Sequence, residues 1–308
     1  MGKTATVTDG NSGDSAGKIA IVTDSNSGIS QAEGENLGIS VIPMPFSINE
    51  ETFYEDVNLT VPEFYNRLAE GANVITSQPS PEAVRNLWNR LLKTHDEVVH
   101  IPMSSGLSGS CESAVLLSRE YGGRVQVADN RRISVSQRQS ALDAVQLAQR
   151  GKSAAQIKEL LEEDCYNSSI YIMLDTLYYL KKGGRITPAA AALGTLLKIK
   201  PVLQIQGDRL DAFAKARTTY QGKSIMLKAL QNDIRNRFGG LADTSKNLCL
   251  YIAHTQNEEA SLVLKKELED TFPGCEVDTA HLPLSIACHI GPGSLAVACC
   301  KRMDYDRT

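Results

Sequence analysis

The sequence predicts an α/β protein of two domains: an N-terminal α/β/α domain built on a parallel sheet, and a C-terminal α/β domain with a mixed sheet. The chain has 308 residues, which is more than one hydrophobic core usually serves. Hydrophobic residues make up 42% and charged residues 22%, as in a globular protein. From Lys18 onward, short apolar runs alternate with helical patterns, which is typical of a sheet covered by helices on both faces.

The N-terminal domain is predicted over residues 18–165. Thr60 and Glu63 form a capping-box pattern at the start of one helix, and Ser80 with Pro81 marks the start of the next. The expected strands are residues 19–22, 39–42, 74–75, 98–101 and 125–128. The expected helices are residues 30–37, 60–70, 81–93, 111–120 and 135–149, followed by 153–164, which Ser153 caps.

The C-terminal domain is predicted over residues 166–308. The segment 208–214 can extend the strand at 202–206 into a hairpin through Gly207 and Asp208, and such an antiparallel pair would make the sheet mixed. The other expected strands are residues 170–174, 248–253, 276–279 and 295–300. The expected helices are residues 188–197, 220–238 and 257–271.

Residues 1–17 are predicted to be a mobile arm or an expression remnant. Residues 3–15 match residues 18–30 at nine of thirteen positions, but the first copy has polar residues where the second has three isoleucines. A parallel strand that is covered on both faces needs a continuous apolar run. Only the second copy can therefore form a buried strand.

Charge and cysteine usage exclude several classes of protein. The net charge is −4 and no run of Lys or Arg exceeds two residues, which argues against a nucleic-acid partner. The seven cysteines are an odd number without a C-x-x-C pair, which favours free thiols in a reducing compartment. No long apolar run and no signal-peptide pattern is present, so we expect a cytoplasmic protein.

Small polar residues follow four of the predicted strands. They occupy residues 23–28, 76–80, 104–110 and 129–130. In an open parallel sheet, ligands bind beyond the carboxyl ends of the strands, so these loops should meet at one crevice. Each loop leads toward a helix N-terminus, which favours an anion. The pattern indicates a carboxylate or a phosphate held by hydroxyls and backbone amides. Ordinary helix capping is the better explanation of any single loop except residues 104–110, where the two explanations are balanced.

Familiar catalytic motifs are missing. The hydrolase elbow G-x-S-x-G is absent, and Arg217 stands where a P-loop ending in Lys223 would need glycine. The five histidines lack H-E-x-x-H spacing, so no metal site is expected. His289 precedes a Gly-Pro-Gly turn and is either a structural or a functional residue. The same alternatives hold for the basic residues at 181–185 and 215–217.

Seven stretches in order resemble the DegV family of bacterial fatty-acid-binding proteins. The resemblance extends from Lys18 to about residue 300, and Ser110 is a departure where the family often has threonine. The stretches are IVTDSNSG (21–28), TSQPSPE (76–82), SSGLSGS (104–110), LYYLKKGGRI (177–186), IKPVLQI (199–205), KAR (215–217) and HIGPG (289–293).

The resemblance implies a carrier of long-chain fatty acids rather than an enzyme. It is similar to the carrier subunit of a fatty acid kinase, in which a separate ATP-dependent catalytic subunit phosphorylates the carboxylate. Thr76 and Ser108 match the hydroxyls that bind the carboxylate, and Arg185 matches a position associated with the partner kinase. The residues that match a supporting role at the carboxyl end are Arg217, His289, Ser77 and Gly109.

Two other functions stay open at this point. One is a dihydroxyacetone-kinase-like phosphotransfer enzyme, against which stand the missing P-loop and the lack of histidine in residues 23–28, 76–80 and 104–110. The other is a regulatory protein that senses lipid. For the carrier, the expected ligand is the fatty acid itself, with no further cofactor and no catalytic residue in this chain, and with transient contact at a membrane surface.

Overall fold

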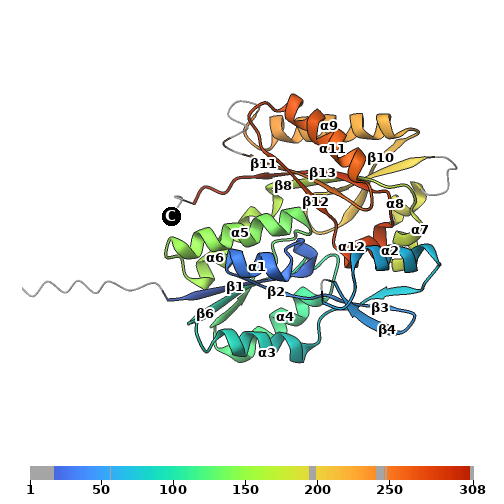
Figure 1. Cartoon of the computed structure of the whole chain (residues 1–308). Coiled ribbons are helices and arrows are strands. Elements are labelled where there is room, and N and C mark those ends of the chain that lie inside the picture. The colour runs from blue at the N-terminus through green and yellow to red at the C-terminus, as the bar shows by residue number, and fades with distance from the viewer. Residues whose placement is uncertain (1–16, 56, 194–198, 241–245, 247, 306–308) are drawn as a thin grey trace, which may run out of the picture.

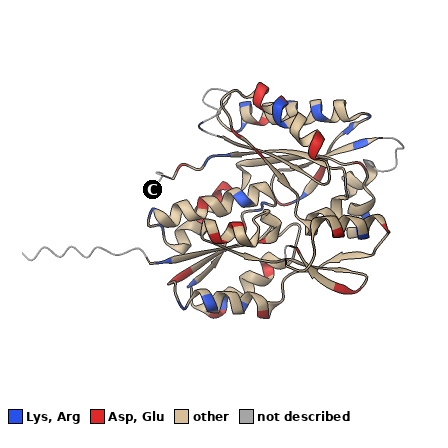
Figure 2. Ribbon diagram, in the orientation of Figure 1, with Lys and Arg blue, Asp and Glu red and all other residues tan. Residues whose placement is uncertain are grey.

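The structure is a computed structural model that describes residues 17–55, 57–193, 199–240, 246 and 248–305. The expected arm lies outside these residues apart from Gly17, as does the end of the helix expected over 188–197. Figure 1 shows two halves, each with strands in the middle and helices around them. The charged residues gather on the helices and loops, whereas the strands are mostly uncharged (Figure 2).

The first half contains the predicted parallel sheet. Its strand order is β2-β1-β6-β7, and every neighbouring pair runs parallel. Ile21 on β1 packs in one apolar cluster, and Ala20 and Val22 pack in another on the opposite face, so this strand is covered on both sides. The strands are β1 (Ile19–Asp24), β2 (Ile39–Ile42), β6 (Glu97–Ile101) and β7 (Val125–Val127).

Helices cover both faces of this sheet, as predicted. One face packs against apolar side chains of α5 and α6, and the other against α3 and α4. Ser80 caps α3 by accepting from the Ala83 N–H, and Ser153 forms a capping box with Gln156 at the start of α6. The helices are α1 (Gln31–Leu37), α3 (Pro81–Leu91), α4 (Ser110–Ser118), α5 (Val135–Gln149) and α6 (Ala154–Glu163), with 3-10 turns η1 (Ser25–Ser27), η2 (Arg119–Tyr121) and η3 (Asp164–Tyr166).

The strand expected at residues 74–75 does not join the parallel sheet. It is β5 (Val74–Thr76), which pairs antiparallel with β3 (Pro45–Ile48), and β3 in turn pairs with β4 (Glu51–Tyr54). The sequence analysis missed β3 and β4 because their turn is Asn49-Glu50, not the Asn-Gly pair typical of a tight hairpin. Both turn residues have positive φ, at 49° and 73°. Helix α2 (Val61–Ala69) packs on this small sheet and has the predicted capping box.

The second half contains the predicted mixed sheet. Its strand order is β10-β9-β8-β13-β11-β12, in which β11 and β12 run parallel and the other neighbours run antiparallel. The hairpin expected through Gly207 joins β9 to β10. The strands are β8 (Ser168–Met173), β9 (Lys200–Ile205), β10 (Leu210–Ala216), β11 (Leu248–His254), β12 (Val277–His281) and β13 (Leu295–Lys301).

The two faces of this mixed sheet have different partners. The outer face packs against α9 (Thr219–Asn236) and α11 (Glu258–Thr271). The inner face belongs to a cluster that also contains Met103 and Val135 from the first half. Three short helices, α7 (Tyr178–Gly183), α8 (Pro188–Leu193) and α12 (Leu284–Ile290), complete this half. The domain boundary at residue 165 stays a prediction. Within the described residues, no helix has both the length and the apolar character needed to cross a membrane.

Backbone from the two halves meets at Gly106. This residue follows β6, and a Cβ atom there would lie 2.2 Å from the carbonyl oxygen of Asp208 in the β9–β10 turn. The Ser104 hydroxyl donates to the same oxygen over 3.1 Å. Because a main-chain carbonyl cannot swing aside as a side chain can, the contact requires glycine.

We predict that Gly106→Ala lowers the free energy of unfolding by about 1–3 kcal/mol, because the added methyl group forces the loop away from Asp208. Urea unfolding measures the change. Gly109→Ala is the matched control from the same loop, since its φ is −70° and its Cβ would meet only the end of the Gln78 side chain, at 3.3 Å. Equal unfolding midpoints for the two variants would contradict the prediction.

Candidate functional site

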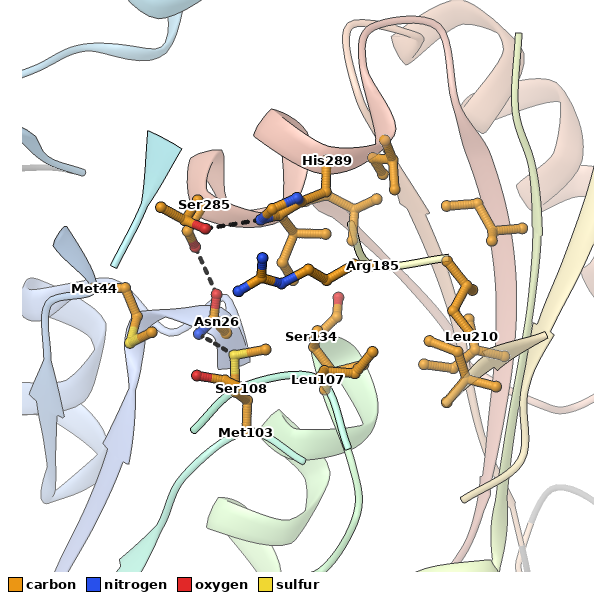
Figure 3. Close-up of a pocket in the computed structure, with 18 of the residues that line it drawn as sticks. Asn26, Met44, Met103, Leu107, Ser108, Ser134, Arg185, Leu210, Ser285 and His289 are labelled. Atoms are coloured by element: carbon orange, nitrogen blue, oxygen red, sulfur yellow. Dashed lines mark hydrogen bonds between the residues drawn. The ribbon is translucent and has the colours of Figure 1, made fainter. Parts of the chain in front are cut away.

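A cavity of about 310 Å³ lies between the two halves. Figure 3 shows side chains from both halves pointing into it. The first half contributes the loops after β1, β5 and β6 and the start of α5, and the second half contributes the inner face of the mixed sheet and α12. The lining residues used below are Asn26, Thr76, Ser77, Gln78, Met103, Ser108, Gly109, Ser134, Ile170, Ile172, Arg185, Ser285, His289, Ala296 and Ala298.

Six of the seven site residues chosen from the sequence line this cavity. Arg217 is the exception: it is exposed just beyond β10, and its backbone N–H donates to Gln221 over 2.8 Å. Arg185, for which the resemblance implies a contact with a partner, points its guanidinium into the cavity (Figure 3). The six lining residues are Thr76, Ser77, Ser108, Gly109, Arg185 and His289.

Helix α12 aims its polar residues at the cavity because its other face is buried. Leu284, Ala287 and Cys288 pack against the three-stranded sheet and α2. Ser285 and His289 are four residues apart and therefore share the opposite side of the helix, which lines the cavity. The sequence analysis expected only a rigid turn around His289; the helix ends at Ile290, and Gly291 follows as its cap.

His289 is held on two sides. Its Nε2 atom lies 2.8 Å from the Thr76 hydroxyl oxygen. Its Nδ1 atom is buried and has no hydrogen-bond partner within the part of the chain that is described. A Cβ atom on Gly183 would lie 2.1 Å from Nδ1, so the absence of a side chain there makes room for the ring. This geometry fixes the plane of the imidazole against Thr76.

The imidazole of His289 is neutral at neutral pH. Burial lowers its pKa to about 4, and the positive charge of Arg185 acts in the same direction. A neutral ring that carries its proton on Nε2 donates to the Thr76 oxygen. The Thr76 hydroxyl proton is then free to point at an anion in the cavity. In the other tautomer Thr76 donates to Nε2 and has no proton left for a ligand.

Ser108 is arranged in a similar way. Its hydroxyl oxygen accepts the backbone N–H of Ser110 over 3.2 Å, at the start of α4. The hydroxyl proton remains available for a second acceptor. When His289 carries its proton on Nε2, Thr76 and Ser108 each have an accepting bond within the protein and a proton to offer to a ligand.

The charge of the lining is positive. Arg185 is its one Lys or Arg residue, and no Asp or Glu side chain is found among the described residues that line it. The guanidinium also donates to the Gly183 carbonyl over 2.7 Å, which anchors it next to His289. A cavity with hydroxyl donors and one cation favours an anionic group at this end.

Sequence reasoning missed two consecutive side-chain hydrogen bonds among the residues that line the cavity. The Ser285 hydroxyl donates to Asn26 over 2.6 Å, and the Asn26 amide donates to the Met103 sulfur over 2.8 Å. Asn26 lies in a loop that the sequence did single out, but nothing marked Ser285 as its partner. Ser134 was also missed; its φ of 56° is rare for a serine and invisible in the sequence.

The rest of the cavity is apolar. Ala296 and Ala298 on β13 lie opposite Ile172 and Ile170 on β8 in the register of the antiparallel pair. Residues two apart on a strand face the same way, so both alanines point inward. Their small side chains leave open space where larger ones would fill the core. The cavity therefore has one polar end and a long apolar remainder.

Comparison with known proteins identifies the family. The sequence model described as "Uncharacterised protein, DegV family" matches residues 18–302. The chain belongs to the DegV family. It is 32% identical over 268 residues to Protein DegV of Bacillus subtilis, covering 85% of this chain and 92% of that protein.

Solved structures of DegV proteins have the same fold. A DegV family protein from Thermus thermophilus, described by its fatty acid binding, superimposes with a TM-score of 0.84 at 31% identity, over 92% of this chain and 100% of that one. DegV of Bacillus subtilis, described as a fatty acid binding protein, gives a TM-score of 0.81 at 30% identity, over 93% and 100%. The two-domain α/β architecture inferred from the sequence is that of the DegV fold.

We predict that His289 makes stability depend on pH. Its pKa is 6.5 when exposed and about 4 in the folded protein, so the unfolded chain binds the proton more readily between these values. Stability therefore falls as the pH drops from 6.5 toward 4. In His289→Gln, whose amide can still bond Thr76 but does not titrate, this loss should be smaller by about 1–3 kcal/mol.

Urea unfolding across that pH range measures the difference. Burial lowers the pKa of His100 to about 3, so His100 also makes the free energy of unfolding fall with decreasing pH, in wild type and variant alike. The comparison must therefore be wild type against variant, with His95→Gln as the control at a half-buried histidine outside the cavity. Identical pH dependence in wild type and His289→Gln would contradict the prediction.

Proposed function

We propose that this DegV protein binds one long-chain fatty acid in the cavity between its two halves. The carboxylate lies at the polar end, where Thr76 and Ser108 each offer a hydroxyl proton, and the tail extends along the apolar inner face of the mixed sheet. The observation that carries the proposal is this division of one cavity into a cationic, hydroxyl-lined end and an apolar remainder. The relatives described as fatty acid binding support it.

The energies favour this orientation of the ligand. A buried carboxylate without partners would cost several kcal/mol, so it must sit where donors are available. Each hydrogen bond to a charged group contributes about 1.5–3 kcal/mol. The tail contributes about 0.8 kcal/mol for each CH₂ group removed from water. The apolar part therefore provides most of the affinity, and the hydroxyls fix which end of the ligand enters where.

We further propose that the protein is a carrier for a separate ATP-dependent fatty acid kinase. Gly109 and Arg185 line the polar end and are exposed, so the carboxylate would lie close to the surface. The tail would lie among buried side chains such as Ile170 and Ala296. A partner enzyme could then reach the carboxylate without opening the core, and transient contact with a membrane surface would supply the acid.

His289 makes a phosphotransfer enzyme the second candidate. The sequence argument against it was the lack of histidine in the strand-end loops, but α12 brings His289 to the end of β5. Its Nε2 is bonded to Thr76, however, and its Nδ1 is buried against Gly183. Incubation of the protein alone with ATP and phosphate acceptors separates the two functions: a carrier shows no transfer until a kinase is added.

The identity of the ligand can be tested directly. Native mass spectrometry of the purified protein, before and after mild organic extraction, should show one molecule of a long-chain fatty acid per chain. A protein that emerges without ligand and fails to take up any long-chain acid would refute the proposal. A ligand of another lipid class would favour the lipid-sensing alternative.

We predict that Thr76→Ala and Ser108→Ala each weaken fatty-acid binding by about 1–3 kcal/mol, because each leaves the carboxylate short of one donor. Displacement of a fluorescent fatty acid measures the affinity. Thr94→Ala and Ser118→Ala are matched controls, since neither residue is buried and their hydroxyls bond only locally. If both site variants bind as tightly as these controls, the carboxylate site is wrongly placed.

We also predict that Arg217→Ala and His289→Ala reduce phosphorylation of the bound acid more than they reduce its retention. An interaction that strengthens in the transition state appears in the rate rather than in the affinity. Arg217 is a cation at the surface and has more to stabilise when phosphate charge arrives there, whereas the neutral His289 acts through the Thr76 hydroxyl that it orients. Acyl-phosphate formation with a bacterial fatty acid kinase is measured beside acid retention.

Arg90→Ala controls for the loss of an exposed arginine far from the cavity. Arg185→Ala separates the two cations, because Arg185 lines the cavity and its loss should lower both retention and turnover. Normal turnover with normal retention in the Arg217 and His289 variants would remove both residues from the mechanism and leave the hydroxyls alone.

A further inference from the structure

Two histidines and a glutamate meet outside the fatty-acid cavity. His254 is the last residue of β11, His281 is the last residue of β12, and the two are direct partners in the parallel register. Glu258 is the first residue of α11. One potential metal-ligand atom from each lies within 4.8 Å of the other two. None of the three residues lines the fatty-acid cavity.

The three side chains of this group lie in close contact. The His281 Nε2 atom lies 3.1 Å from a Glu258 carboxylate oxygen. The two imidazole rings are close, with centroids 4.3 Å apart. His254 is buried, and its Nδ1 accepts the Asn257 N–H over a long 3.3 Å bond.

Space is available beside the group for a further ligand. Glu258 and His281 both line a cavity of about 540 Å³ that also reaches Ser25 and Glu55. Glu55 accepts the backbone N–H of Leu284 and therefore holds the start of α12 at the same place. Water or a small anion in this cavity could complete the coordination that three protein ligands leave open.

We propose that His254, His281 and Glu258 bind a divalent transition-metal ion, with Zn²⁺ as the best match. Two imidazoles and one carboxylate form a ligand set typical of zinc, and imidazole generally favours Zn, Cu, Fe and Ni over Mg or Ca. The ion would lie between the His281 Nε2 atom and the Glu258 carboxylate, and it would displace the long bond from Asn257. The H-E-x-x-H pattern does not reveal this site, because its ligands come from three different elements.

The position of the site gives the ion a structural role. The Leu282 N–H donates to the His254 carbonyl over 2.8 Å, and the chain then turns through Pro283 into α12. An ion at this point would join the ends of β11 and β12 to the start of α11 (Figure 1). It would thereby brace the entry to the helix that carries Ser285 and His289.

Calorimetric titration of ZnCl₂ into the metal-stripped chain, without any added histidine tag, tests the proposal. We expect one ion per chain and at least ~10-fold weaker binding in His281→Ala and in Glu258→Gln, since even outer partners of a metal site matter this much. Both residues are exposed, so these variants should fold. Glu259→Gln and His95→Ala are the controls and should bind like wild type.

Co²⁺ in place of Zn²⁺ identifies the ligands. Tetrahedral cobalt absorption without a thiolate charge-transfer band supports histidine and carboxylate ligands, whereas that band would show binding to a cysteine and overturn the assignment. The assignment would also be overturned if His281→Ala and Glu258→Gln left the Zn²⁺ affinity unchanged. The same holds if a variant that carries both substitutions bound Zn²⁺ as tightly as wild type. The result is independent of whether the chain binds fatty acid.

Discussion

The polar end of the cavity depends on the hydrogen bond between Thr76 and His289, which joins residues 213 positions apart in the chain. A polar pair in a largely apolar cavity has few other partners, so its geometry is fixed by what surrounds it. The three-stranded sheet contains Thr76, and it also packs against one face of α12. His289 lies on the opposite face of that helix and therefore lines the cavity. Gly183 makes room for the ring from the other side. The small sheet, which the parallel sheet does not need for its own core, is therefore what positions the polar end.

Sequence patterns were sufficient for the two large sheets and insufficient for the parts between them. Strands such as β1 and β13 are apolar runs that are buried on both faces, so their composition is informative. Residues 45–54 form β3 and β4 through a turn whose positive φ values fall on Asn49 and Glu50, and glutamate is no signal for such a turn. Helix α12 has only seven residues, and the Gly-Pro-Gly that follows it dominated the interpretation of the segment.

The same distinction applies to the candidate site. Hydroxyl-rich loops at strand ends predicted a crevice, and the resemblance to the DegV family singled out Thr76 and Ser108 within those loops. The sequence could not tell which basic residue lines the cavity, because Arg185 and Arg217 both belong to stretches that match the family. Only the fold shows that Arg185 lines the cavity and that Arg217 does not. Ser285 gave no signal at all, because its bond to Asn26 spans 259 positions and depends on how α12 is packed.

The alanines of β13 extend this reasoning from the polar end to the tail. Val297 and Cys299 alternate with Ala296 and Ala298 along the strand. The larger side chains therefore pack in the outer core, and the inner face has only small ones. Side chains that line an empty apolar space lose dispersion contacts that no water molecule restores. The inner face of the sheet thus makes fewer dispersion contacts than a filled core would, and a fatty acyl chain in the cavity would supply them. An acyl chain bound as proposed would become part of the hydrophobic core, and any ligand bound by the folded state alone raises its stability with concentration.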